Sequence, residues 1–169
     1  MTPHAILGLD PGLRNFGWCL LLADGTPRAA GVLGRERDGG LGDELLRAEE
    51  IARDLLGLRD TFQPSMLAME ALTFPRGARA ARMLSLVHGV VVGVAVGYLT
   101  AIHPKSMRMA LGSAGKEDFE RLAKAAGLDA LLDRVSRARR QHAYDAWAVA
   151  ETARRALTPP GAGLRMEAA

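Results

Sequence analysis

The stretch ILGLDPGLRNFGWCLL, residues 6–21, places one acid between two apolar runs. Residues 4–10 and 16–23 each have the composition of a strand, and Asp10 ends the first of them, directly before a Pro-Gly turn. An unpaired buried charge is costly, so an acid at the edge of a core needs a partner. A cation is one such partner. The alternative is a turn role, in which the carboxylate accepts from nearby backbone N–H groups.

Turn residues and apolar periodicity predict a mixed sheet with helices packed on it. A third strand at 28–34 follows the Asp24-Gly25 turn, which predicts an antiparallel meander. A strand at 65–70 comes after a helix, which favours parallel pairing with the first strand, and a short strand at 99–104 is the fifth. Helices are expected after the loop 35–42 and at about 77–97, 105–111, 117–126 and 140–156. The sequence therefore predicts one α/β domain over 1–157, with 158–169 as a flexible tail.

The first predicted helix has an amphipathic pattern. Its apolar residues recur at three-to-four spacing with charged residues between them, which predicts an apolar face directed at the core. The apolar set is Leu45, Leu46, Ile51, Leu55 and Leu56; the charged set is Glu44, Arg47, Glu50 and Arg53.

The composition of the chain says more about the cellular compartment than about a binding partner. The 169 residues are 49% hydrophobic and 24% charged, as in an ordinary globular domain, and the net charge of +3 does not identify a partner. Cys19 is the only cysteine, so no disulfide can form within the chain, and its apolar setting predicts a core residue. With no secretory signal, a cytoplasmic protein is expected. The uncharged stretch 83–102 is long enough for a membrane span, but a buried helix running into a strand explains it more simply.

Basic residues are segregated along the chain. Between Glu70 and Glu117 there is no acidic residue, whereas six lysines and arginines occur there: Arg76, Arg79, Arg82, Lys105, Arg108 and Lys116. Such segregation is typical of a surface that meets phosphates. A solvated basic face is the alternative.

Acids at the ends of predicted elements point to one site. If the first and fourth strands are neighbours, Asp10 and Glu70 emerge side by side at their carboxyl ends. His142 and Asp145 share a face of the last helix, whose small residues, Ala143, Ala146 and Ala150, would let it lie close to the sheet. Converging carboxylates repel unless a proton or cation is shared, and their oxygens suit Mg²⁺ or Mn²⁺. Taken singly, each residue could instead be a turn, cap or solvated terminus.

Three motifs in order, GLDPG, AME and HAYDAWAVA, resemble the RuvC family of Holliday-junction resolvases within the ribonuclease-H-like superfamily. The resemblance runs from about residue 5 to 156. Between the second and third motifs, Lys105 and Lys116 resemble the family's pair of lysines eleven residues apart. The implied fold is a ribonuclease-H-like five-stranded sheet.

The resemblance implies a set of catalytic residues. Asp10, Glu70 and Asp145 match three metal-binding acids, and His142 stands where the family usually has a fourth acid. It implies two Mg²⁺ or Mn²⁺ ions that assist phosphodiester hydrolysis. His142 as a nitrogen ligand would favour Mn²⁺, and a proton shuttle is the alternative role. Lys116 would neutralise charge on the scissile phosphate.

The same resemblance implies contacts with DNA. Lys105 would hold a flanking phosphate beside Lys116. The family's stacking aromatic follows the fourth-strand acid by three positions, but here Thr73 stands there and Phe74 comes next. Arg76 and Arg79 are the further candidate phosphate contacts.

The implied partners are a four-way DNA junction, a second copy of the chain and a branch-migration motor complex, at the nucleoid. A C₂ homodimer would supply two symmetric sites, and the glycine-lined helix at 83–97 is the candidate interface, unless that face packs on the sheet.

Three other functions are compatible with parts of the pattern. A superfamily nuclease acting on RNA would share Asp-x-Gly but lack the paired lysines. The stretch DPGLRNFG also fits the phosphate loop of actin-like ATPases and sugar kinases, which need two such domains, and this chain is too short for that. A non-catalytic junction-binding module is the third alternative, made plausible by His142.

Overall fold

A computed structural model describes residues 5–34, 40–72, 77–95, 99–113 and 115–157. The predicted tail, 158–169, lies outside the described residues. The elements in chain order are β1 (Ile6–Asp10), β2 (Phe16–Leu21), β3 (Pro27–Leu33), α1 (Leu41–Phe62), β4 (Met66–Glu70), α2 (Ala78–Val94), β5 (Leu99–Ile102), α3 (Pro104–Leu111), α4 (Lys116–Ala125), the 3₁₀ turns Leu128–Leu131 and Arg137–Arg139, and α5 (Arg140–Leu157).

The strands form one mixed sheet in the order β3-β2-β1-β4-β5. β1, β2 and β3 pair antiparallel, and β1 pairs parallel with β4, which pairs parallel with β5. The β2–β3 turn contains Gly25 at φ 88°, a backbone conformation that glycine adopts without strain. The predicted α/β architecture, meander and parallel pairing are confirmed.

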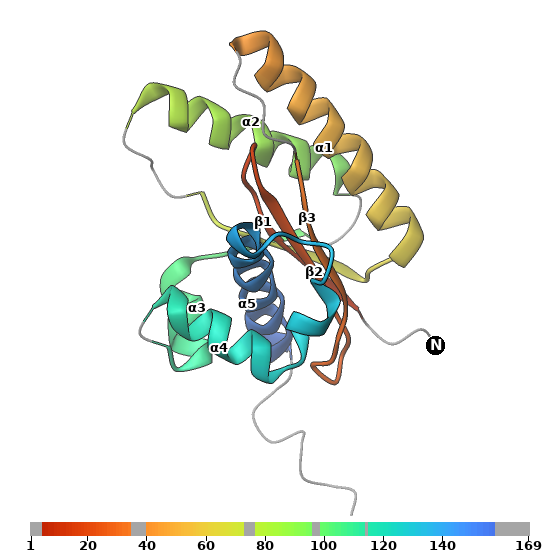
Figure 1. The fold of residues 1–169 in the computed structure, drawn as a ribbon, viewed down its shortest axis with the longest axis vertical. Coiled ribbons are helices and arrows are strands. Elements are labelled where there is room, and N and C mark those ends of the chain that lie inside the picture. Colours follow the sequence, from red (N-terminus) through yellow and green to blue (C-terminus); the bar gives the residue numbers. More distant parts are fainter. Residues whose placement is uncertain (1–4, 35–39, 73–76, 96–98, 114, 158–169) are drawn as a thin grey trace, which may run out of the picture.

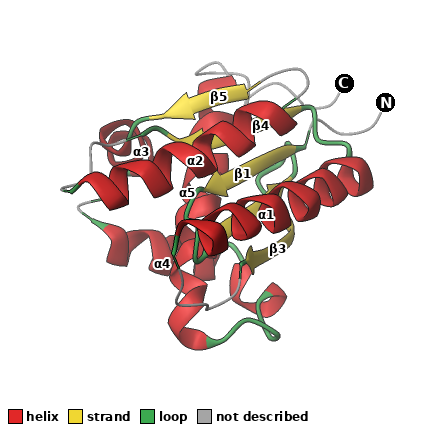
Figure 2. Cartoon of the chain, turned by 90° about the horizontal axis from the view of Figure 1, so that it is seen from above, coloured by secondary structure: helices red, strands yellow, loops and turns green. Residues whose placement is uncertain are grey.

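Helices cover both faces of the sheet. α1 and α2 lie on one face, over a core that contains Leu7, Leu9 and Phe16. α5 lies on the other face with α3 and α4, and Cys19 is buried there as predicted. Figure 1 shows the strands between these two groups, and Figure 2 shows α1 and α2 side by side. None of the described helices is long and apolar enough to span a bilayer.

α5 rests on the sheet at glycines. A Cβ built at Gly8 would collide with the Ala146 carbonyl, and one built at Gly17 would collide with the His142 carbonyl. Ala143, Ala146 and Ala150 are fully buried, so small residues on both sides allow this close approach, as their size predicted. The position of the α5 backbone, and therefore of His142, depends on the missing side chains at Gly8 and Gly17.

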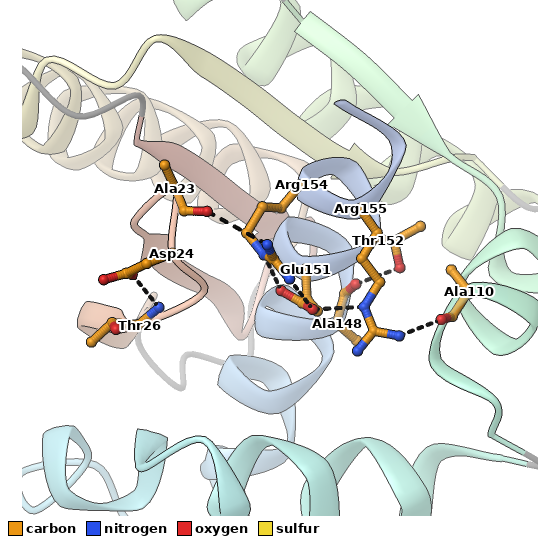
Figure 3. A network of polar contacts seen from close by, with 9 residues as sticks. All are labelled: Ala23, Asp24, Thr26, Ala110, Ala148, Glu151, Thr152, Arg154 and Arg155. Carbon is orange, nitrogen blue, oxygen red and sulfur yellow. Dashed lines mark hydrogen bonds and ion pairs between the residues drawn. The ribbon is translucent and has the colours of Figure 1, made fainter. Parts of the chain in front are cut away.

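The C-terminal half of α5 is held by a polar network (Figure 3). Buried Glu151 accepts from Arg154 Nε at 2.6 Å and from Arg155 Nε at 2.7 Å. Arg154 also donates to the Ala23 carbonyl beside the β2–β3 turn, and Arg155 donates to the Ala110 carbonyl of α3. The buried charge of Glu151 is thus paired and hydrogen-bonded, and its two arginine partners connect this end of α5 to the β2–β3 turn and to α3.

The prediction for the buried face of α1 is partly wrong. Ile51 and Leu55 are fully buried, but Leu45, Leu46 and Leu56 are exposed. Glu44 and Arg47, which the pattern placed on the charged face, are buried instead. The stripe 44, 47, 48, 51 and 55 keeps helical periodicity, but it is rotated because α1 packs against α2, whose arginines provide partners for Glu44.

Gly17→Ala should lower the free energy of unfolding by about 1–3 kcal/mol, because the methyl group would push the His142 backbone away from β2. Chemical denaturation monitored by circular dichroism measures this change. Gly57→Ala is the control: its Cβ meets nothing within 4 Å and its residue is in α1, so it should be neutral or stabilise by up to about 1 kcal/mol. Equal stability of the two variants would contradict the proposed close approach.

Candidate active site

Asp10 and Glu70 end two neighbouring parallel strands. The β1–β4 register pairs Leu9 with Met69, so the next residues, Asp10 and Glu70, lie side by side at the carboxyl edge. Burial raises the pKa of Glu70 to about 7, and the negative charge of Asp10 and a side-chain hydrogen bond with Asp10 act in the same direction. The two carboxyl groups are close enough to compete for one proton, as the strand pattern predicted.

α5 brings the other two predicted residues to this edge. His142 Nδ1 lies 2.8 Å from Asp10 Oδ2, and both side chains are partly buried. Asp145 is almost fully buried one turn further along α5, and Gln141 Nε2 donates to its Oδ1 at 2.9 Å. Burial and the nearby charge of Asp10 raise the pKa of Asp145, although hydrogen bonds from Lys116 and Gln141 oppose this rise. Asp10, Glu70, His142 and Asp145 thus form one cluster, here called the acidic cluster.

Lys116 places a positive charge on the acidic cluster. It is the first residue of α4, and its Nζ lies 2.7 Å from Asp145 Oδ2. Burial opposes the charge of the ammonium, but the hydrogen bond to Asp145 and the charges of Asp145, Asp10 and Glu70 together raise its pKa. The side chain remains 67% exposed, so the ammonium is accessible to a ligand as well as to Asp145.

A small pocket of about 70 Å³ opens beside the acidic cluster. Glu70, Asp145 and Lys116 line it together with Arg108 of α3. Lys105, the other lysine of the predicted pair, is exposed one turn earlier in α3 and does not line this pocket. Sequence reasoning therefore missed Arg108, although its position three residues after Lys105 on a short helix was the available signal.

His88 holds the end of β4. Its Nε2 lies 3.1 Å from the main-chain carbonyl of Glu70, and its Nδ1 lies 2.9 Å from the carbonyl of Leu84 on its own helix, α2. Carbonyl oxygens only accept, so the tautomer of His88 with its hydrogen on Nε2 donates to Glu70, and the tautomer with its hydrogen on Nδ1 donates to Leu84. His88 is therefore a positioning residue for Glu70, and no sequence motif identified it.

The donors of the acidic cluster fit a divalent metal ion. In the described part of the chain no group of three His, Cys, Asp or Glu side chains is arranged to hold a metal ion. Lys116 pairs with Asp145, and His142 pairs with Asp10. The chemistry nevertheless matches: three carboxylates and an imidazole lie at one edge of the sheet, and burial, followed by the charge of Asp10, raises the pKa of Glu70. Hard cations such as Mg²⁺ and Mn²⁺ take such oxygen ligands.

Two predicted DNA contacts, Phe74 and Arg76, lie outside the described residues. Arg79 is described: it is in the first turn of α2, where its Nε bonds Glu44 Oε1 at 3.1 Å.

Comparison with known proteins agrees with this arrangement. No protein-family model matches the chain. Crossover junction endodeoxyribonuclease RuvC of Cereibacter sphaeroides is 29% identical over 127 residues, covering 70% of this chain and 74% of the relative. The RuvC of Prochlorococcus marinus is 27% identical over 154 residues, covering 88% of this chain and 94% of the relative. Over most of its length the chain is similar in sequence to RuvC proteins.

Solved structures show that the fold is shared as well. Thermus thermophilus RuvC in complex with a Holliday junction substrate superposes with a TM-score of 0.72 at 22% identity, over 90% of this chain and 94% of that one. At this identity the likeness establishes the fold. The ribonuclease-H-like, RuvC-type sheet predicted from the motifs is confirmed.

Glu70→Gln should stabilise the metal-free protein above pH 7. The folded-state pKa of about 7 exceeds that of an unfolded glutamate, so the folded chain binds the extra proton and loses stability as pH rises toward 7. Gln mimics the protonated form, so its melting temperature should exceed wild type by roughly 2–8 °C at pH 8 and by little near pH 4. Differential scanning calorimetry in EDTA measures this.

The exposed Glu49→Gln serves as the control, since Glu49 pairs with exposed Arg53 on α1 and should show no such pH-dependent gain. If the melting temperature of Glu70→Gln differed from that of wild type by the same amount at every pH, the raised pKa of Glu70 would be contradicted.

His88→Asn and His88→Gln form a matched pair. Gln can place an amide donor near the position of Nε2, which faces Glu70, whereas Asn places it near Nδ1, which faces Leu84. His88→Asn should weaken Mn²⁺ binding about 10-fold, and His88→Gln should remain within about threefold of wild type. Isothermal titration calorimetry measures both affinities; equal losses would exclude a specific role for the Glu70 contact.

Proposed function

We propose that this protein is a divalent-metal-dependent endodeoxyribonuclease of the RuvC type that resolves four-way DNA junctions by symmetric phosphodiester hydrolysis. The observation that carries the proposal is the acidic cluster itself, with Lys116 paired to Asp145 at the carboxyl edge of the sheet. The names of the relatives, crossover junction endodeoxyribonucleases, support the same activity.

Asp10, Glu70, His142 and Asp145 are the residues that would hold the metal. When bound, divalent ions supply Lewis-acid chemistry for water attack and departure of the 3′ oxygen. Since Asp10 is bonded to His142 and lies beside Glu70, it is the central carboxylate of the set. A neutral imidazole among the ligands favours Mn²⁺ over Mg²⁺.

Other groups of the protein orient the proposed ligands and would neutralise the charge of the phosphate. His142 is oriented by the Nδ1 contact with Asp10, which leaves Nε2 as its ligand or proton-carrying atom. Gln141 holds Asp145 Oδ1, so the orientation of that carboxylate is set on one side by α5 itself. Lys116, exposed at the start of α4, exchanges its contact with Asp145 for an oxygen of the scissile phosphate. Arg108 adds a second positive group at the pocket rim.

Paired cuts on opposed strands require two sites related by symmetry, so we propose a C₂ homodimer built on α2. Ser85, Gly89, Val92 and Gly93 form an exposed stripe on this helix, at spacings of three and four residues. A Cβ at Gly89 or Gly93 would meet nothing within 4 Å, so this face does not pack on the sheet within one copy. Gly97, the third glycine of the predicted interface, lies outside the described residues.

The deciding experiment compares wild type with Asp145→Asn on a labelled synthetic four-way junction and on a linear duplex, in Mg²⁺ and separately in Mn²⁺. Wild type should cut only the junction, at symmetric positions and faster in Mn²⁺, and Asp145→Asn should cut neither substrate. We expect Asp145→Asn to keep the fold because the amide occupies the same volume, Gln141 can still donate to its oxygen, and exposed Lys116 can turn away from the amide N–H₂; circular dichroism checks this.

Other outcomes would select other functions. Tight junction binding without cutting in either metal would indicate a non-catalytic binding module, and cutting of RNA in preference to the junction would indicate an RNA nuclease. Gly93→Glu tests the dimer: it should yield monomers in sedimentation and unpaired nicks, whereas Gly57→Glu, at an exposed glycine of α1, should keep both dimer and paired cuts.

A further inference from the structure

The two oxygens of the Asp145 carboxylate have different partners. Oδ1 accepts from the side-chain amide of Gln141 at 2.9 Å, and Oδ2 accepts from the ammonium of Lys116 at 2.7 Å. Gln141 precedes Asp145 by four residues on α5, whereas Lys116 comes from α4. The negative charge of the carboxylate is therefore met at Oδ2, by a group that another element supplies.

Burial fixes Asp145 in place but leaves Lys116 able to move. The side chain of Asp145 is 3% exposed, whereas that of Lys116 is 67% exposed. A buried carboxylate is costly without a compensating charge, so Asp145 needs a cation at Oδ2. An exposed lysine loses little when it exchanges one contact for water. The pair is thus a fixed anion with a replaceable cation.

Gln141 makes Oδ1 the less favourable oxygen for a cation. Residues four apart share a helix face, so this hydrogen bond is local to α5. The amide N–H₂ is a neutral donor and adds no positive charge. A cation that took Oδ1 would break this bond and leave Lys116 beside it, whereas a cation that takes Oδ2 replaces one positive group with another.

A divalent ion and the Lys116 ammonium would repel each other at Oδ2. The ammonium nitrogen lies 2.7 Å from this oxygen. A Mg²⁺ ion at its usual ligand distance of about 2.0–2.1 Å would then lie within about 5 Å of the nitrogen. Like charges at that separation repel strongly beside a buried group. Lys116 also lines the pocket next to Glu70, so a displaced ammonium stays near the site.

We propose that a divalent ion and Lys116 compete for Asp145 Oδ2, and that Gln141 is the positioning residue that confines both to this oxygen. Metal binding then releases Lys116 from Asp145, so the lysine becomes available to a phosphate only after the metal is in place. The inference rests on the proposed metal-dependent function and adds an order of events to it. By linkage, a phosphate that takes Lys116 also tightens metal binding.

Trace acetylation of the wild-type protein tests the release of Lys116 directly. Brief exposure to acetic anhydride, followed by peptide mass spectrometry, measures the reactivity of each lysine amine in saturating Mn²⁺ and in EDTA. Lys116 should become several times more reactive in Mn²⁺, because it loses its contact with Asp145. Lys124, which pairs with Glu120 on the same helix, is the internal control and should not change. Unchanged reactivity of Lys116 would overturn the inference.

Lys116→Met tests the competition through Mn²⁺ affinity, measured by isothermal titration calorimetry without DNA. Removal of a competitor should tighten binding about 5- to 10-fold, whereas removal of a group that only orients Asp145 should weaken it. Lys124→Met makes the same change about two turns later in α4 and should stay within about twofold of wild type. Weaker Mn²⁺ binding by folded Lys116→Met would overturn the inference.

Gln141→Met separates competition for one oxygen from simple repulsion between charges. Without the Gln141 amide, Mn²⁺ can take Oδ1 while Lys116 stays on Oδ2, so adding Lys116→Met to this background should change the affinity by less than about twofold. Repulsion alone predicts the full gain in both backgrounds, and that result would overturn the role of Gln141. Methionine keeps a high helix propensity at this position, and circular dichroism checks that the variants fold.

The outcomes for the inference and for the proposed function are distinguishable. Wild type that cuts junctions and binds Mn²⁺, but shows no change at Lys116, would overturn the inference alone. Wild type that binds no Mn²⁺ would overturn the proposed metal-dependent function and this inference with it.

Discussion

The close approach of α5 to β1 and β2 is the constraint on which the rest of the structure depends. Without side chains at Gly8 and Gly17, the helix backbone lies directly on the strands, and His142 and Asp145 reach the edge where Asp10 and Glu70 end. The Glu151 network fixes the other end of the same helix against α3 and the β2–β3 turn. A helix held at both ends carries its side chains to a defined place, which a site of closely spaced charges requires.

The acidic cluster has more negative charge than the positive groups of the chain beside it compensate. Burial and mutual repulsion raise the pKa of Glu70 and of Asp145, and Lys116 compensates only part of the negative charge. A fold that was selected for stability alone would replace such a cluster with apolar side chains. The energetic cost of the cluster is explained if divalent cations complete the site, as the proposed function requires.

α2 connects three features that are separate in the sequence. One of its faces packs on the sheet, and His88 on this helix reaches back to the Glu70 carbonyl. Its first turns present Arg79 and Arg82 to Glu44, and its exposed stripe of Ser85, Gly89, Val92 and Gly93 is open for a second copy. A change in the position of α2 would therefore reach Glu70, the ion pairs of Glu44 and the proposed dimer interface together.

The sequence by itself determined the strands, their pairing and the four members of the acidic cluster. Alternation, turn residues and acids at strand ends are local patterns, and parallel strands necessarily bring their carboxyl ends to one edge. Only the tertiary structure decided which face of α1 is buried. Periodicity shows that a helix has one buried face, but it does not show which residues of α1 turn toward the sheet and α2. Glu44 is buried because Arg79 and Arg82, 35 and 38 residues away, meet it there. His88 joined the site for the same reason: its contact with the Glu70 carbonyl lies between elements, and no local pattern encodes it. For Arg108 the spacing from Lys105 was a local signal, but only the packing of α3 beside Glu70 and Asp145 places it at the pocket.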